Sequence, residues 1–401
     1  MRRSRGAGVD TPRATERDSG PGRRGRKKGA PTRTCACGGA RAHRGRKPKS
    51  WLTAAGLIRV VRVYFVCRKC RVGAYPLDAR AGVDGYASRQ ARRLMCLAGA
   101  SWSFDRASEH LEELCGLKVS DNTIRKACQE EATAMACWQR ESTEARVPFR
   151  KAEGDIEFST DGTNVNTTGG WREMRVGIFS KRHRGEPADV TNWHCRDLPS
   201  PHVRLSFAAI ETADRFRSRW SRWVSRLGID DTSQITALGD GASWIWEGAA
   251  MHFAGHDGVL DIFHALEHVA ETAKGLFGKH LDKASQWRDQ AREALLVGGW
   301  PSMFDLLRAT KRNVSRGRWA KHGRPLEKYL GKRKEQLDYP RRLAAGQSIG
   351  SGQVEGACKH MIGRRLKQTG ARWRVRRVNR MACLCALIHA DQWKTYWDSA
   401  A

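Results

Sequence analysis

The sequence is short of acidic residues and has no long apolar run. Asp and Glu number 42 against 73 Lys and Arg, which leaves a formal net charge of +31 over 401 residues. A surplus of this size cannot be hidden inside a fold, so it concentrates polyanions around the protein. No stretch approaches the roughly 20 apolar residues of a membrane-spanning helix, and none near the start resembles a secretory signal. We therefore expect a cytoplasmic protein with no membrane partner.

Two further features bound the organisation of the chain. Its length favours two or three domains, and fifteen Trp residues are too many for a disordered tail protein. Residues 1–34 are rich in Arg, Gly and Pro and show no apolar period. Such a segment cannot bury enough surface to offset its ordering entropy, so we expect a disordered basic arm, although a misassigned start codon would look the same.

Four of the twelve cysteines form two close pairs, with a β-branched stretch at 57–66 between the pairs. A cytosolic chain keeps its thiols reduced, so paired cysteines indicate metal ligands before disulfides. Strands carrying such turns suit a zinc-ribbon-like domain over 35–86 with a structural Zn²⁺. The alternative is four buried or adventitious thiols. The proposed ligands are Cys35, Cys37, Cys67 and Cys70.

Residues 87–145 favour a helix-turn-helix-like DNA-binding part. Apolar residues at helical spacing run over 103–114, a turn contains Gly116, and Ser120 is a good N-cap for a second helix. A plain αα-hairpin that packs on its neighbour is about equally compatible with this pattern. In the DNA-binding interpretation, three residues early on the second helix meet base edges. They are Asn122, Arg125 and Lys126.

From Gly154 onward, strands alternate with helices. We expect strands over 155–161, 175–180, 203–210, 234–239 and 258–263, with a helix over 213–227. Three strands, helix, strand, helix, strand, helix is the element order of an RNase H-like fold. We therefore expect an α/β fold whose mixed sheet is flanked by helices.

Two of the expected strands end in an acidic residue beside glycine, Asp161 and Asp240. Carboxylates at strand ends lie at the rim of a sheet, so these two could converge. Two-metal phosphoryl transfer needs a third acid. Glu247, Glu267 and Glu355 are candidates, and Glu355 stands apart because it follows glycines at the start of a helix and precedes a basic tract. The helix dipole alone would also favour an acid there.

Four motifs carry a resemblance to a known family: Asp161-Gly162-Thr163 with Trp171-Arg-Glu173, Gly239-Asp240-Gly241-Ala242-Ser-Trp244-Ile245-Trp246, Ile349-Gly-Ser-Gly-Gln-Val-Glu355-Gly-Ala-Cys-Lys359, and Arg364-Arg365-Leu-Lys367-Gln-Thr-Gly370-Ala-Arg-Trp373. They resemble motifs of ISKra-type insertion-sequence transposases, and the resemblance covers about Cys35 to His389. The resemblance implies an RNase H-like DDE transposase in which Asp161, Asp240 and Glu355 bind Mg²⁺ or Mn²⁺. The run Asp261-Ile-Phe-His264 also resembles an element of Mutator-like relatives that places His264 near the active site.

The long gap between Asp240 and Glu355 predicts an insertion. We expect a catalytic core over 146–275, an all-helical insertion over 276–347, and the Glu355 helix with a basic tract over 348–392. The insertion could grip DNA ends, or it could only buttress the catalytic lobe or form a dimer interface. Both roles are about equally compatible with its composition.

The basic tract after Glu355 predicts contact with DNA. Continuous positive charge with an interleaved aromatic suits a phosphate backbone and an unpaired base, although many charge runs are merely solvated faces. The residues proposed to bind DNA are Arg364, Arg365, Lys367, Arg372 and Trp373.

The resulting expectation is a bacterial, nucleoid-associated transposase. It would bind the terminal inverted repeats of its element and target DNA, and would act as a dimer or higher oligomer. A structure-specific nuclease on the same fold, or a non-catalytic zinc and helix-turn-helix regulator, remain as alternatives. A Tyr recombinase is less compatible, because only six Tyr residues are present to supply a nucleophile.

Overall fold

The computed structural model describes residues 34–399, so the predicted basic arm lies outside the described residues except for Thr34. The contacts divide the chain into two units. One comprises Val60–Arg80 together with the described residues up to Lys49, and the other comprises Ser50–Arg59 together with the chain from Ala81 onward. No helix in the described part of the chain is both long and apolar enough to cross a membrane.

The first unit contains the open end of a long β-hairpin, whose tip at Ser50–Arg59 is counted with the second unit. The expected strand between the cysteine pairs is confirmed as β2, whereas β1 was not expected because its sequence is basic and contains proline. Arg62 on β2 binds Asp78 at 2.5 Å and lies over the ring of Tyr75, which ties the helix after the hairpin to it. The elements are β1 (Arg41–Thr53), β2 (Gly56–Cys67), β3 (Gly73–Ala74) and α1 (Pro76–Arg80).

The second unit begins with a three-helix segment. Ser120 caps α4 by accepting a hydrogen bond from the Thr123 N–H, as the sequence predicted, and Gly116 ends α3 with a φ of 62°. Leu111, Leu117 and Ile124 are buried where these helices meet. The elements are β4 (Val83–Asp84), β5 (Ala87–Ser88), α2 (Arg89–Ser101), α3 (Phe104–Cys115), α4 (Asp121–Glu141) and α5 (Val147–Lys151).

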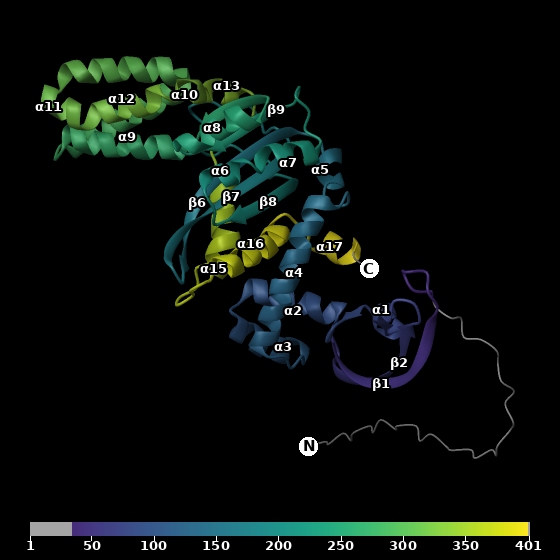
Figure 1. Ribbon diagram of the computed structural model, residues 1–401. Helices are drawn as coiled ribbons and strands as arrows, with labels where there is room; N and C mark the ends of the chain where they lie inside the picture. Colours follow the sequence, from purple (N-terminus) through teal and green to yellow (C-terminus); the bar gives the residue numbers. More distant parts are fainter. Residues whose placement is uncertain (1–33, 400–401) are drawn as a thin grey trace, which may run out of the picture. The chain divides into compact units, whose positions relative to one another are not determined.

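A five-stranded mixed sheet follows, with the strand order β10-β9-β6-β7-β8. The pairs β6–β7 and β7–β8 are antiparallel, whereas β9 runs parallel to both β6 and β10. The expectation of a mixed sheet flanked by helices is confirmed (Figure 1). The elements are β6 (Asp155–Thr167), β7 (Gly170–Arg182), β8 (Val203–Ala209), α6 (Ala213–Arg217), α7 (Trp220–Leu227), β9 (Gln234–Gly239), α8 (Ser243–His252) and β10 (Gly255–Leu260).

Three expected boundaries in this region are wrong. Asp161 does not end its strand, because β6 continues pairing with β7 as far as Thr167. The expected helix over 213–227 is interrupted between α6 and α7. The last expected strand stops at Leu260, because Asp261 caps a helix that begins at Ile262.

The rest of the chain is helical. Helices α9, α10 and α12 lie side by side (Figure 1). Buried Leu and Trp side chains fill the space between them, and α10 is interrupted at Gly299, where φ is 58°. The elements are α9 (Ile262–Phe277), α10 (Leu281–Asn313), α11 (Arg316–Arg318), the π-helical turn η1 (Trp319–Gly323), α12 (Arg324–Gly331), the 3₁₀ turn η2 (Lys334–Gln336), α13 (Tyr339–Ala344), α14 (Gly352–Ala357), the π-helical turn η3 (Cys358–Gly363), α15 (Arg364–Leu366), α16 (Val375–His389) and α17 (Trp393–Ser399).

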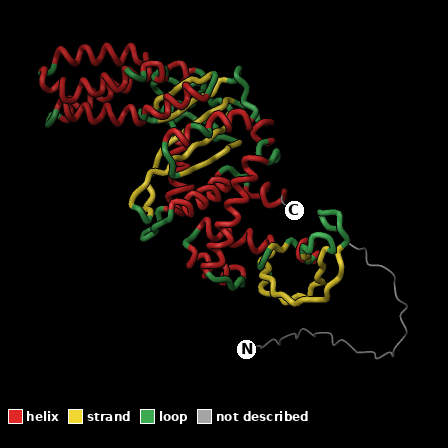
Figure 2. The backbone as a smooth tube through the Cα atoms, viewed as in Figure 1, coloured by secondary structure: helices red, strands yellow, loops and turns green. Residues whose placement is uncertain are grey.

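Helices cover both faces of the second sheet (Figure 2). On one face, Phe158 and Phe179 belong to an aromatic cluster with α6, α7 and α8. On the other face, Val165 and Val176 pack in a core shared with α14, α16 and α4. Asp161 is paired with Val176, so the Asp161 side chain points to this second face of the sheet. The segment bearing Glu355 packs on the same face of β6 and β7.

Candidate functional site

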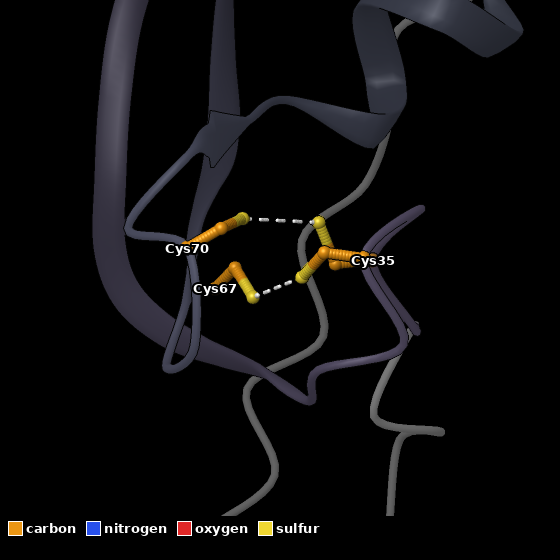
Figure 3. Close-up of side chains that lie close together, drawn as sticks. Cys35, Cys67 and Cys70 are labelled. Carbon is orange, nitrogen blue, oxygen red and sulfur yellow. Dashed lines mark hydrogen bonds between the residues drawn. The ribbon is translucent and has the colours of Figure 1, made fainter.

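The four cysteines of the first unit come together as predicted. Cys35 Sγ lies 3.5 Å from Cys70 Sγ, and Cys37 Sγ lies 3.5 Å from Cys67 Sγ (Figure 3). All four sulfur atoms lie within 4.8 Å of one another. Four thiolates at about 2.3 Å from a zinc ion would be about 3.8 Å apart in a tetrahedron. The cluster could therefore bind a metal ion such as zinc.

The backbone of the two turns shapes this cluster. A Cβ atom at Gly39 would lie 2.9 Å from Cys67 Sγ and 2.7 Å from Lys69 Cβ, so only glycine fits there. The backbone N–H of Cys37 is the largest cause that lowers the pKa of Cys35, to about 6. The backbone N–H of Cys70 likewise lowers the pKa of Cys67. The backbone thus favours the thiolate form of Cys35 and Cys67, which is the form that binds metal, whereas hydrogen bonds to the thiols of Cys37 and Cys35 help to raise the pKa of Cys70 to about 12.

Asp161 lies on β6, and Asp240 directly follows β9, the neighbouring parallel strand of the second sheet. Ser159 on β6 is paired with Leu238 on β9, and each aspartate follows two residues later. Burial is the largest cause that raises the pKa of Asp161; the Gly162 backbone N–H opposes it, and the negative charge of Asp240 raises the pKa further. The two carboxylates are therefore close enough to interact electrostatically.

Glu355 lies in the first turn of α14, and its side chain is half-buried. One turn further along, Cys358 donates its S–H to Asp161 Oδ2 at a distance of 3.9 Å. Burial raises the pKa of the Cys358 thiol to about 12, and the charge of Asp161 adds to this effect, as does that of Glu355. The helical segment that carries Glu355 and Cys358 therefore lies against the strand that carries Asp161.

The three acids do not form one tight cluster. Within residues 34–399, the cysteines are the only set of three or more candidate ligands whose atoms all lie within 4.8 Å of one another. Carboxylates that hold a pair of metal ions roughly 3.5–4 Å apart need not all lie within this distance of one another, because they can bind from opposite sides of the pair. Oxygen donors of this kind suit hard cations such as Mg²⁺.

Asp261 connects two parts of this region, a role that the sequence analysis missed. The carboxylate is completely buried, and its Oδ1 accepts the backbone N–H groups of Phe263 at 2.7 Å and His264 at 3.0 Å. Its Oδ2 accepts the N–H of Ser351, just before α14. The available signal was its position directly before an apolar helical stretch, which is typical of an N-cap.

His264 lies in the first turn of α9. Its positive form would lower the pKa of Asp161, which places the imidazole within electrostatic reach of that carboxylate. Its Nδ1 is 3.4 Å from Glu267 Oε2. His264 thus lies within electrostatic reach of Asp161, while Glu267 pairs with it.

Two side chains from the helical segment before α14 contact the loop after Asp240. A Cβ atom at Gly241 would lie 2.2 Å from the ring of Tyr329, and Arg333 donates a hydrogen bond to the carbonyl oxygen of Gly241. Burial, followed by the charge of Asp240, raises the pKa of Tyr329 to about 12. The sequence offered no signal for this contact, because these residues are far from Asp240 along the chain.

The proposed DNA-binding residues of α4 lie in its first two turns. Asn122 and Lys126 are exposed and Arg125 is half-buried. Arg125 Nη2 donates to Asn122 Oδ1 at 2.7 Å, and Lys126 Nζ lies 3.9 Å from Glu130 Oε1. One face of the helix start is therefore available to a ligand.

The proposed DNA-binding residues after Glu355 fall into two groups. Arg364, Lys367 and Arg372 are exposed. Arg365 is only 3% exposed and Trp373 only 9% exposed, and the Arg365 guanidinium stacks on the Trp373 ring. The placement of these two side chains does not support direct contact with a base, because they stabilise the core of the tract.

The chain is thus a mixed α/β protein with a four-cysteine cluster in one unit and an acidic region at the sheet of the other. The profile of an uncharacterised protein family, UPF0236, matches residues 42–396. The chain belongs to this family. No curated protein matches it.

Proposed function

We propose that the chain is a DDE transposase of a DNA insertion sequence. The observation that carries the proposal is the placement of Asp161 on β6 and of Asp240 directly after the adjacent parallel strand β9, with the Glu355 helix packed against β6. The element order supports an RNase H-like core, and the motif resemblance supports the assignment of the three acids. The contiguous helices over 281–344 support the interpretation of an insertion.

In this proposal, Asp161, Asp240 and Glu355 hold Mg²⁺ or Mn²⁺. The ions would supply Lewis-acid chemistry that activates a water or a DNA 3′-OH and stabilises the leaving oxygen. The raised pKa of Asp161, caused by burial and then by the Asp240 charge, fits a carboxylate whose repulsion a cation would relieve. Asp261 positions the Glu355 helix through Ser351.

The remaining parts follow from the same proposal. The four-cysteine cluster holds a structural zinc ion, because four thiolates leave no open coordination position. The basic residues of α4 and of the tract after Glu355 bind the terminal inverted repeats and target DNA. Synapsis of two ends requires at least a dimer, and the protein acts at the bacterial nucleoid.

A plasmid assay tests the chemistry. The full-length protein is incubated with Mg²⁺ and a supercoiled plasmid that carries the element with its terminal repeats. The variant is Asp240→Ala, and the matched control is Asp230→Ala, an exposed Asp in the loop before β9. We expect strand transfer by the wild type and the control, and none by Asp240→Ala.

Each outcome of this assay has a distinct meaning. Nicking without strand transfer supports a structure-specific nuclease, and binding without cleavage supports a regulator. Equal activity of the wild type and Asp240→Ala removes Asp240 from the proposed site.

A further inference from the structure

A groove runs between the start of α4 and the start of α16. It consists of a hollow of about 1180 Å³ and a second of about 1010 Å³. Both hollows are lined by Arg125 and Gln129 from α4, and by Arg374 and Arg377 from the other wall. Because they share these residues, the two hollows form one continuous surface, which we call the α4–α16 groove.

The α16 wall of this groove is a cluster of arginines without carboxylate partners. Arg374, Arg376 and Arg377 are exposed, and Arg380 follows one turn later and is half-buried. None of these four side chains forms an ion pair with any residue in the described range 34–399. The opposite wall adds Arg125 and Lys126, so positive side chains face one another across the groove.

The acidic residues along the groove are fewer. Glu130 lies in the first hollow, where it contacts Lys126. Asp105 and Asp121 line the second hollow. The groove therefore keeps a positive surplus, and the acids do not pair with the α16 arginines.

The position of these arginines on their helix is unfavourable in the protein alone. The first turn of α16 contains no acidic residue, and no side chain caps it. Cations near a helix N-terminus are repelled by the helix dipole, by about 0.3–1 kcal/mol each at an exposed position. An anion in the groove would reverse this effect, because it would interact favourably with both the guanidinium groups and the helix start.

A buried donor lies beside the same surface. Arg365 lines the second hollow and is 3% exposed; its Nε donates to the Gly99 carbonyl oxygen at 2.6 Å. Its Nη2 has no hydrogen-bond partner among the described residues. A buried guanidinium nitrogen without a partner is costly unless an acceptor approaches it.

We propose that the α4–α16 groove binds the sugar–phosphate backbone of duplex DNA, mainly through Arg374, Arg376, Arg377 and Arg380. The choice of DNA as the polyanion rests on the proposed function, whereas the positive groove does not. The first turns of α4 face the arginines of the opposite wall. Contacts from both walls to phosphates can therefore hold the DNA without α4 reading base edges as a recognition helix. The groove therefore binds DNA with little dependence on sequence.

Binding measurements at several salt concentrations test this proposal. The probe is a fluorescently labelled duplex of random sequence, mixed with the full-length protein in EDTA so that no cleavage occurs. The groove variant is Arg376→Ala/Arg377→Ala/Arg380→Ala. The charge-matched control is Arg215→Ala/Arg222→Ala/Lys283→Ala, three exposed cations outside the groove.

Counterion release sets the expected size of the effect. Each phosphate contact contributes about 0.9 to the slope of log K against log salt, or about 5-fold in affinity near 0.15 M salt. We expect the groove variant to lose about 100-fold in affinity and about 3 in slope. The control should stay within about 3-fold of the wild type, because its cations do not contact phosphates.

A second variant separates charge from folding. Replacing the same three arginines by Lys keeps the charge, so it should retain most of the salt slope. If the Ala variant melts early, the single change Arg377→Ala should still reduce the affinity by about 5-fold. Equal losses in the groove variant and its control, or no loss in the groove variant, would overturn the proposal.

Two further results decide the ligand and its link to the chemistry. Tighter binding of a duplex RNA of the same sequence than of the DNA would overturn the assignment to DNA. If the wild type binds DNA through the groove but never cleaves it with Mg²⁺, the groove stands and the transposase proposal fails. If the wild type cleaves DNA with Mg²⁺ and the groove variant binds DNA as tightly as the wild type, the transposase proposal stands and the groove proposal fails.

Discussion

Asp261 offers a direct test of how the acidic region is held together. Its buried carboxylate caps α9 through the N–H groups of Phe263 and His264, and it binds the N–H of Ser351 on the segment that leads into the Glu355 helix. The perturbation is Asp261→Asn, which keeps one side-chain oxygen for the cap. The new NH₂ group then faces the Ser351 N–H, so a donor meets a donor.

The structure sets the expected loss of stability. Ser351 is 3% exposed, so its N–H cannot turn to water when the acceptor is removed. A buried donor left without a partner costs about 1–3 kcal/mol. Asp261→Ala also removes the helix cap, which adds about 0.5–2 kcal/mol. We therefore expect the free energy of unfolding to fall by about 1–3 kcal/mol for Asn and by about 1.5–5 kcal/mol for Ala.

Urea unfolding followed by Trp fluorescence measures this difference. The matched control is Asp230→Asn, because Asp230 also accepts a backbone N–H, that of Thr232 at 3.1 Å, but is exposed. Water can replace that acceptor, so we expect a loss below about 0.5 kcal/mol. An Asp261→Asn variant as stable as the Asp230→Asn control would refute the idea that this carboxylate connects the two helices. Asp261→Asn should also reduce strand transfer under conditions where the protein stays folded, since the Glu355 helix loses its anchor.

Three other predictions concern separate parts of the chain. Cys67→Ser should lower the zinc content measured by elemental analysis and the melting temperature, whereas Ser at the exposed Cys115 should change neither. Burial lowers the pKa of His389 from 6.5 to about 4. As the pH falls, this histidine is therefore protonated in the unfolded chain before it is protonated in the folded protein. Between about pH 6.5 and 4, the wild type should therefore lose up to about 3 kcal/mol of stability that His389→Gln does not lose, as pH-dependent urea unfolding would show. Gly241→Ala should displace the Tyr329 ring, cost about 1–3 kcal/mol in the same unfolding assay and reduce cleavage, and unchanged values would argue against this contact.

Local sequence signals predicted many elements of the second unit. The β9 strand was predicted with both of its boundaries, and the α4 helix with its Ser120 cap, because alternation and capping depend on neighbouring residues. The extent of β6 was not predictable in the same way. Its continuation past Asp161 depends on pairing with β7 and on burial of Val165, neither of which a single strand reveals.

The candidate site shows the same division. Asp161 and Asp240 were predicted from acids beside glycines near strands, which is a local pattern. The burial of Arg365 and Trp373 was not predictable. A basic tract with an aromatic residue has the same sequence pattern whether its side chains are exposed to solvent or stacked in a core. Their stacking depends on Phe104, whose ring also lies under the Arg365 guanidinium and which comes from a distant helix.

The helical segment before α14 could have served to grip DNA, to support the sheet or to form a dimer, and its contacts favour support. Tyr329 and Arg333 pack on Gly241, directly after Asp240. Tyr339 is fully buried and donates its O–H to the Leu260 carbonyl oxygen at 2.9 Å, directly before Asp261. The segment thus contacts the ends of both strands that lead into the acidic region. Changes within it should therefore alter the chemistry of the site even at positions that no DNA could reach.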